Sequence, residues 1–122
     1  MAGRHGKIVT IVSAGAERAI EGYGALGIAK AAAVTTVRYL ALELGPRGIN
    51  VNAVSAGLVD TDAVRDLPQR KLLQRVVRMR TPMRRLTTVQ DVAQTVVFLC
   101  SEAASMIQGH VLVVDGGLSI RW

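Results

Sequence analysis

Three segments rich in valine and isoleucine, separated by segments of helical pattern, constrain the fold of this chain more than any other feature. The first, residues 7–13 (KIVTIVS), is a nearly continuous run of β-branched residues. A strand buried on both faces of a parallel sheet has this pattern. Residues 49 to about 54 (INVNAV) and 110–117 (HVLVVDGG) predict two further strands, the last ending in a glycine turn.

Helical patterns fill the intervals between these strands. Residues 23–44 are rich in alanine and leucine, and Pro46 in the following LGPRG cannot continue a helix. Residues 66–80 predict a strongly basic helix. Thr88, with Asp91 three residues later, resembles a capping box and opens a third helix through VAQTVVFLCS. Strands alternating with helices predict an α/β fold with a parallel sheet and right-handed crossovers.

Three strands are few for such a sheet, so we expect a partial Rossmann-like unit, the C-terminal half of a doubly wound domain. Residues 1–122 would form this single unit. The turn after the first strand (SAGAERAIEG) does not fit the G-x-G-x-x-G pattern that binds a pyrophosphate, and no other stretch fits better. The sequence therefore predicts that the nucleotide-binding half is absent from this chain.

Composition narrows the class of protein. The single cysteine, Cys100, cannot form an internal disulfide, and we predict that it is a small residue of the aliphatic core. We find no run long and apolar enough to cross a membrane, and MAGRHGKIVT lacks the core of a signal peptide. His5 and His110 are isolated, so no metal site is expected. These features predict a soluble cytoplasmic protein without a membrane partner.

Tyr23 and Lys30 are the first candidates for chemistry. Seven positions of α-helix are close to two turns, which places both side chains on one face, about 10 Å apart along the axis. An ammonium near a phenol favours the phenolate, and this would make the tyrosine a better proton donor. On spacing alone, a half-buried tyrosine and a solvated lysine of an ordinary helix remain the simpler interpretation.

The flanking motifs change that interpretation. GAERAIEGY, GIAKAA, VRYLALELGPRGINVNAVSAG and MIQGHVLVVDGG follow one another along nearly the whole chain. With them the chain resembles the C-terminal half of a short-chain dehydrogenase/reductase. That family usually has Tyr-x-x-x-Lys, whereas the spacing Tyr23-x6-Lys30 is similar to its divergent branch, the enoyl-(acyl-carrier-protein) reductases. The resemblance implies reduction of an enoyl thioester with NADH or NADPH.

The resemblance also implies roles for single residues. Tyr23 would hydrogen-bond the thioester carbonyl and stabilise the enolate that follows hydride addition. Lys30 would hold the nicotinamide ribose. Gly57 and Val59 would lie beside the nicotinamide, where backbone groups meet its carboxamide. Thr61 matches a hydroxyl near the cofactor's phosphate or amide. For Gly57 a role in the turn, and for Thr61 a role as a helix cap, stay open.

Ser13 departs from the branch pattern, in which many members carry a second tyrosine ten residues before the first. At the end of its strand, Ser13 would either polarise the substrate carbonyl or cap the strand. Thr10 matches the catalytic serine of the wider family, but it lies inside the strand and is interpreted as structural.

Residues 60–86 carry nearly all of the net charge. Eight basic residues against three acidic ones give +5 of the chain's +6: Arg65, Arg70, Lys71, Arg75, Arg78, Arg80, Arg84 and Arg85 against Asp60, Asp62 and Asp66. The resemblance makes this region a substrate-binding flap whose basic rim would steer an acidic acyl carrier protein or coenzyme A thioester. A solvated helix face stays open, and the scarcity of aromatic residues argues against nucleic acid.

Three functions remain open. The first is an enoyl reductase fragment or subunit, active if complemented by the missing half, because this chain alone would bind NADH or NADPH weakly or not at all. The second is a non-catalytic truncated relative that acts as an oligomeric or partner-binding module. The third, a 3-ketoacyl or other carbonyl reductase, is disfavoured by the x6 spacing. We expect a homo-oligomer or a complementing partner chain, with Trp122 docking on a neighbouring subunit.

Overall fold

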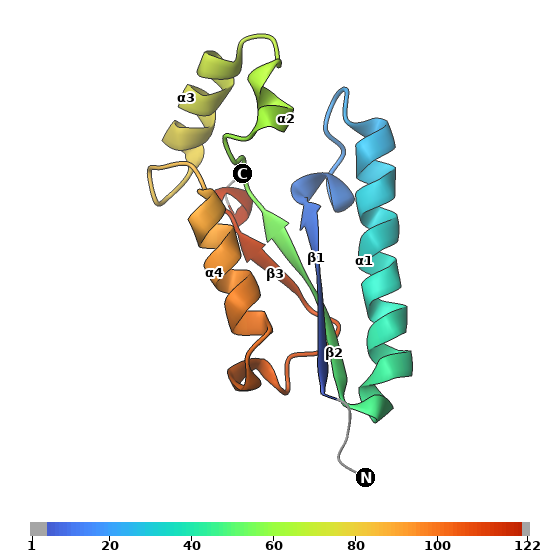
Figure 1. The fold of residues 1–122 in the computed structure, drawn as a ribbon. Helices are drawn as coiled ribbons and strands as arrows, with labels where there is room; N and C mark the ends of the chain where they lie inside the picture. The colour runs from blue at the N-terminus through green and yellow to red at the C-terminus, as the bar shows by residue number, and fades with distance from the viewer. Residues whose placement is uncertain (1–4, 121–122) are drawn as a thin grey trace.

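The computed structural model describes residues 5–120, and its centre is a parallel three-stranded sheet in the order β1-β2-β3 (Figure 1). The strands are β1 (Gly6–Ser13), β2 (Ile49–Ala56) and β3 (Val111–Val114). The register of β1 and β2 runs from Gly6 opposite Ile49 to Ser13 opposite Ala56. The predicted α/β class and the partial parallel sheet are confirmed. Trp122 lies outside the described residues.

Two helices sandwich the sheet. Helix α1 (Gly24–Leu44) covers one face and α4 (Val89–Leu99) covers the other (Figure 1). Each helix buries its own cluster against the strands, because successive strand residues point to opposite faces. Val12, Val51 and Ala53 belong to the cluster on the α1 side, and Val54 and Leu99 to the cluster on the α4 side.

The basic helix predicted over residues 66–80 starts four residues later than expected, so its predicted start was wrong. A short helix, α2 (Asp62–Arg65), precedes a break, and α3 (Arg70–Arg80) begins only after Gln69. Gln69 has a φ of 57°, which is left-handed, and Pro68 before it has no backbone N–H to donate to a helix. Both helices lie beyond the carboxyl ends of the strands (Figure 1).

Helix α1 corrects one expectation. By length and composition, Gly24–Arg47 would suffice to cross a membrane, although no such run was expected from the sequence. The helix instead packs against the sheet, where Val34, Val37 and Ala41 are buried in the core. The segment is therefore a layer of this α/β fold.

Of the two predictions made for the ends of α4, the one at the N-terminus is confirmed and the one at the C-terminus is wrong. The Thr88 side chain accepts from the Asp91 N–H while the Asp91 carboxylate accepts from the Thr88 N–H, so the predicted capping box is confirmed. Cys100 is the C-terminal cap residue and is exposed, so its assignment to the core was wrong. The position one residue beyond the helix turns its side chain toward the surface.

Side-chain amides fasten β3 to β2. Asn52 is 1% exposed, its Nδ2 donates to the Ile107 carbonyl at 2.9 Å, and its Oδ1 accepts from the His110 N–H at 2.9 Å. Gln108 Nε2 donates to the carbonyls of Ala41 and Ile49. These bonds hold the chain entering β3 against the central strand.

Candidate active site

Tyr23 and Ser13 meet at the carboxyl end of β1. The strand ends at Ser13, a single 3-10 turn (Ala14–Ala16) reverses the chain, and Tyr23 is the N-cap residue of α1. Gly22, just before it, has a φ of 75°, a conformation that glycine adopts without strain. The Ser13 Oγ lies 3.0 Å from the Tyr23 hydroxyl oxygen, and either group can donate the hydrogen bond.

Lys30 reaches the same strand from two turns further along α1. Its Nζ donates to the Ile11 carbonyl at 3.2 Å. Because Ile11 and Ser13 are two residues apart on β1, the fold brings Ser13, Tyr23 and Lys30 to one end of one strand. An ammonium has three N–H donors, so Lys30 retains two beyond this bond.

Gly57, Val59 and Thr61 leave β2 at its carboxyl end and run toward α2. The Gly57 N–H donates to the Val114 carbonyl at 2.9 Å, and Val59 forms a parallel bridge with Thr87. Thr61 is the N-cap residue of α2, but its side chain makes no cap hydrogen bond. Among the described residues, no hydrogen bond joins these three to Tyr23 or Lys30.

Gly57 has a packing role beyond the turn considered from the sequence. A Cβ at this position would lie 2.7 Å from the Thr87 Oγ1 and 3.0 Å from the Asp115 Cβ. The first distance is shorter than real Cβ atoms show and the second is unusually tight, so the close approach of Thr87 and Asp115 favours glycine here. Thr10 lies inside β1, opposite Ala53, as expected for a structural residue.

Arg65, Arg70 and Arg85 of the basic segment pair with nearby carboxylates. Arg70 bonds Asp60 at 3.0 Å, and Arg65 bonds Asp62 at 2.8 Å. The Arg85 guanidinium contacts both carboxylate oxygens of Asp91, at 2.6 and 3.0 Å. Hydrogen bonds from Arg85 and then from Thr88 hold the pKa of Asp91 well below its usual range, and the same pair raises the pKa of Arg85.

Helix α3 presents the remaining charge to solvent. Lys71, Arg75, Arg78 and Arg80 are exposed, and no residue of the helix is buried. The apolar side chains of Leu72 and Met79 are 56% and 59% exposed. The segment therefore carries an apolar stripe together with a high local positive charge.

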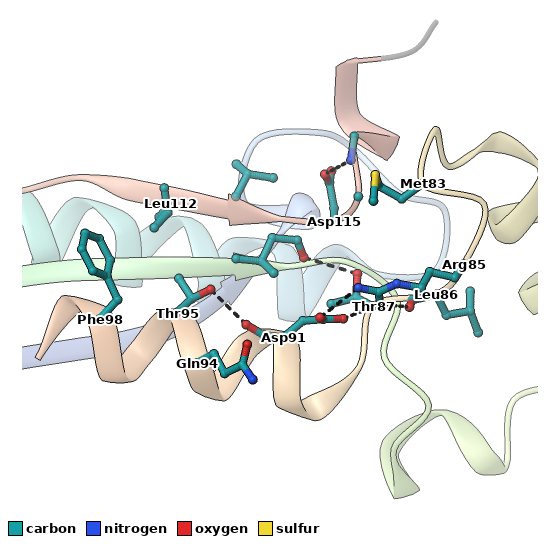
Figure 2. Close-up of a pocket in the computed structure, with 14 residues that line it drawn as sticks. Met83, Arg85, Leu86, Thr87, Asp91, Gln94, Thr95, Phe98, Leu112 and Asp115 are labelled. Atoms are coloured by element: carbon teal, nitrogen blue, oxygen red, sulfur yellow. Dashed lines mark hydrogen bonds and ion pairs between the residues drawn. The ribbon is translucent and has the colours of Figure 1, made fainter.

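A cavity of about 490 Å³ lies elsewhere, between α4, β3 and the chain around Met83 (Figure 2). None of the residues predicted as site residues lines it. Its charged groups already have partners: Arg85 pairs with Asp91, and the Asp115 carboxylate accepts from the N–H groups of Gly117 and Ser119. Its geometry thus offers no free acid or base.

A smaller cavity of about 360 Å³ borders Tyr23 and includes residues that the sequence did not single out. Arg18 is one of them, and its guanidinium donates to the Ser119 carbonyl at 2.5 Å, which links the turn before Tyr23 to the C-terminal segment. Gly15 and Gly27 are two others. A glycine inside a helix costs stability, so Gly27 was a signal that something packs closely against it. Residues 5–120 hold no cluster of three or more metal-ligating side chains.

Comparison with known proteins places these residues in context. Residues 1–119 match the family model described as Enoyl-(Acyl carrier protein) reductase. The enoyl-(acyl-carrier-protein) reductase (NADH) FabI of Escherichia coli is 44% identical over 114 residues, which are 93% of this chain and 43% of the relative. The 1-cyclohexenylcarbonyl-CoA reductase of Streptomyces collinus is 45% identical over 122 residues, 94% of this chain and 42% of that protein.

Solved structures agree with these relatives. The Bacillus cereus enoyl-acyl carrier protein reductase, in complex with NADP+ and indole naphthyridinone, superposes with a TM-score of 0.93 at 38% identity, over 97% of this chain and 46% of its own. A gluconate 5-dehydrogenase from Burkholderia cenocepacia, with NADP and tartrate, gives 0.90 at 28% identity over 97% of this chain and 46% of its own. The chain thus spans less than half the length of these relatives.

Proposed function

This chain belongs to the enoyl-(acyl carrier protein) reductase family of short-chain dehydrogenases/reductases, and we propose that it forms the proton-donor half of a nicotinamide-dependent enoyl thioester reductase. The observation that carries the proposal is the gathering of Ser13, Tyr23 and Lys30 at the carboxyl end of β1. Ligands of open α/β sheets bind outside that end of the strands.

The chain's residues fit one end of a nicotinamide cofactor. Lys30 has two N–H donors free for ribose hydroxyls, and the segment of Gly57, Val59 and Thr61 offers backbone groups at the same end of the sheet. The link from β1 to α1 begins with a three-residue 3-10 helix, and its sequence does not fit the G-x-G-x-x-G pattern that binds a pyrophosphate. We therefore propose that a nucleotide-binding half, in the same or in a second polypeptide, completes the site.

Tyr23 supplies the electrophilic part of the reaction. A nicotinamide bound there would supply the hydride. When the β-carbon of an enoyl thioester accepts it, the π electrons move to the carbonyl oxygen, and the Tyr23 hydroxyl stabilises that enolate by donating a hydrogen bond. Because the Tyr23 hydroxyl has a single proton, Ser13 donates its own hydrogen bond to the Tyr23 oxygen in that state and so orients the hydroxyl. A proton from solvent water then adds to the α-carbon and completes the saturated thioester.

The substrate we propose is an acyl carrier protein or coenzyme A thioester. Both carriers are anionic, and α3 with its neighbouring chain would raise their association rate through long-range attraction. The Tyr23-x6-Lys30 spacing favours an enoyl substrate over a ketone. We place the protein in the cytoplasm, where such carriers are found.

A second candidate function has an observation of its own. Ile28 and Leu42 on α1 are 74% and 76% exposed, and Val97 on α4 is 70% exposed. Apolar surface on both outer layers favours association with further copies or with a partner chain. A non-catalytic module would use these surfaces without needing Tyr23, and an oligomeric enzyme would use both.

Turnover separates the two candidates. The chain is mixed with NADH or NADPH and an enoyl thioester, with and without the separately produced nucleotide-binding half of the Escherichia coli relative, while oxidation of the reduced nicotinamide is followed by absorbance. We expect turnover that needs the added half and falls about 10²- to 10⁴-fold in Tyr23→Phe, which keeps the ring but loses the donor. Lys30→Met should weaken cofactor binding. Absence of turnover in every mixture, with the complex formed, would favour the non-catalytic module.

A further inference from the structure

The ring of Tyr23 lies directly on the backbone of Gly15. A Cβ placed on Gly15 would be 2.3 Å from the Tyr23 Cε1 and 2.4 Å from its Cδ1. Contacts under 3.0 Å to a Cβ essentially do not occur in proteins. The space in which a side chain of residue 15 would stand is therefore occupied by the edge of the tyrosine ring.

Gly27 supports the same arrangement from α1. A Cβ at Gly27 would lie 2.9 Å from the Gly15 carbonyl oxygen and 3.8 Å from the Tyr23 Cδ1. Two glycines, one in the turn after β1 and one in the first turns of α1, thus allow the helix to approach the turn with the ring beside them. The backbone φ of neither is left-handed, so their use is close approach and not a special turn.

The rest of Tyr23 is fixed as well. Its N–H donates to the Ile20 carbonyl at 3.0 Å, and its own carbonyl accepts from the Gly27 N–H at 2.7 Å. Its hydroxyl, at the far end of a rigid ring, lies 3.0 Å from the Ser13 Oγ. With the backbone held, the surface against which the ring edge rests decides where the hydroxyl lies.

We propose that Gly15 is a positioning residue for Tyr23: the absence of a side chain at residue 15, supported by Gly27, sets the ring so that the hydroxyl reaches Ser13. To bring the 2.3 Å contact to the 3.4 Å of ordinary van der Waals contact, the ring or the turn must move by 1.1 Å. A misplacement of about 1 Å at a reacting group can cost about 10²-fold in rate. The catalytic consequence rests on the function proposed for Tyr23, but the geometric statement does not.

The chain is suited to a direct test because it has only two tyrosines. Tyr39→Phe, on the exposed face of α1, leaves Tyr23 as the sole tyrosine, and ¹³C labelling of tyrosine Cζ then gives one NMR signal that reports on the hydroxyl. Four variants are compared in this background: Gly15→Ala, Ser13→Ala, the double variant, and Gly24→Ala as the matched control. A Cβ at Gly24 meets nothing within 4 Å.

We expect Gly15→Ala to shift the Cζ signal and Gly24→Ala to leave it in place. Ser13→Ala should shift the signal in the parent but not in Gly15→Ala, because the hydroxyl has already left Ser13. An unchanged signal in Gly15→Ala, or a full effect of Ser13→Ala in its presence, would overturn the proposal. This readout needs no turnover, so an inactive enzyme with the expected coupling contradicts only the proposed function.

Stability gives a second test if Gly15→Ala folds poorly. Denaturant unfolding is measured for Gly15→Ala in the parent and in Tyr23→Ala, which removes the ring. We expect the loss of stability in the parent to be largely absent in Tyr23→Ala, since the clash is with the ring. An equal loss in both backgrounds would mean that residue 15 is intolerant for another reason, and the proposal would fail.

Discussion

The hydroxyl oxygen of Tyr23 lies 3.0 Å from the Oγ of Ser13, across the turn that joins β1 to α1. The two residues are ten positions apart in sequence, and their contact ties the start of α1 to the last residue of β1. A serine here reaches the phenol without filling the space in front of it. The contact explains how a chain with serine at this position can still orient its tyrosine.

Ser13→Ala removes this hydrogen bond and little else. We expect it to lower the free energy of unfolding by about 1 kcal/mol, the usual net value of such a bond, as measured by urea denaturation. Ser13→Thr keeps a hydroxyl and is the control. A loss of the same size in Ser13→Thr would indicate that packing, and not the hydrogen bond, is responsible.

Gly57→Ala places a methyl group against Thr87 and Asp115. Because the Thr87 Oγ1 would be only 2.7 Å away, we expect the variant to lose about 1–3 kcal/mol of stability, the usual cost of overpacking. Adding Thr87→Ala to Gly57→Ala should restore part of the lost stability, because it removes the Oγ1 that the new methyl group contacts. If Gly57→Ala unfolds at the parent's denaturant concentration, the close approach at this turn is not as the structure has it.

The Arg85–Asp91 pair predicts a pH-dependent stability. The pKa of Asp91 is lower in the folded chain than in the unfolded one, so the pair stabilises the fold fully above the ordinary Asp pKa of about 3.9. This effect begins to decline below that value and is lost as the pH falls through the lowered pKa of the folded chain. Asp91→Asn should therefore lower the melting temperature near neutral pH, and its difference from the parent should shrink in acid.

Two variants control this experiment. Asp62→Asn removes an exposed ion pair whose side chains are 66% and 87% accessible, and it should change stability little at any pH. Thr88→Ala removes the uncharged half of the capping box, and it should cost about 1 kcal/mol with weak pH dependence. A pH-independent effect of Asp91→Asn would contradict an ionised carboxylate as the source of the stabilisation.

Asn52→Ala tests the amide clamp between β2 and β3. The change leaves the Ile107 carbonyl and the His110 N–H without their partner at a partly buried place, so we expect a loss of about 1–2 kcal/mol. The variant should raise the amide hydrogen-exchange rates of β3 more than those of β1. Gln90→Ala, on the exposed surface of α4, is the control, and equal exchange rates in β3 of both variants would refute the clamp.

Much of the fold could be predicted because its signals are local. The β-branched run ending at Ser13, the helix ending before Pro46 and the Thr88–Asp91 capping box each depend on neighbours a few residues away, and each is found where it was predicted. The basic helix over residues 66–80 was wrong at its start, because the left-handed Gln69 is a backbone state that no pattern of charges reveals.

In the candidate site, too, the local features could be predicted from the sequence and the tertiary contacts could not. Tyr23 and Lys30 could be paired from their helical spacing, since two turns of helix fix their common face. Their contacts with Ser13 and Ile11 depend on how α1 lies across β1. The roles of Gly15 and Gly27 depend on the close approach of the two glycines, with the ring of Tyr23 against Gly15. A glycine in sequence shows only that a side chain is missing, and not what fills its place.

Four features follow from residues close together along the chain: the alternation of strands and helices, the Thr88–Asp91 cap, the local concentration of positive charge and the seven-residue spacing of Tyr23 and Lys30. The strand end that the tyrosine contacts, the surface that holds its ring and the pairing of the polar groups depend on the three-dimensional packing. Those outcomes depend on the packing of α1 and α4 on opposite faces of the sheet, where atoms remote in sequence compete for the same space.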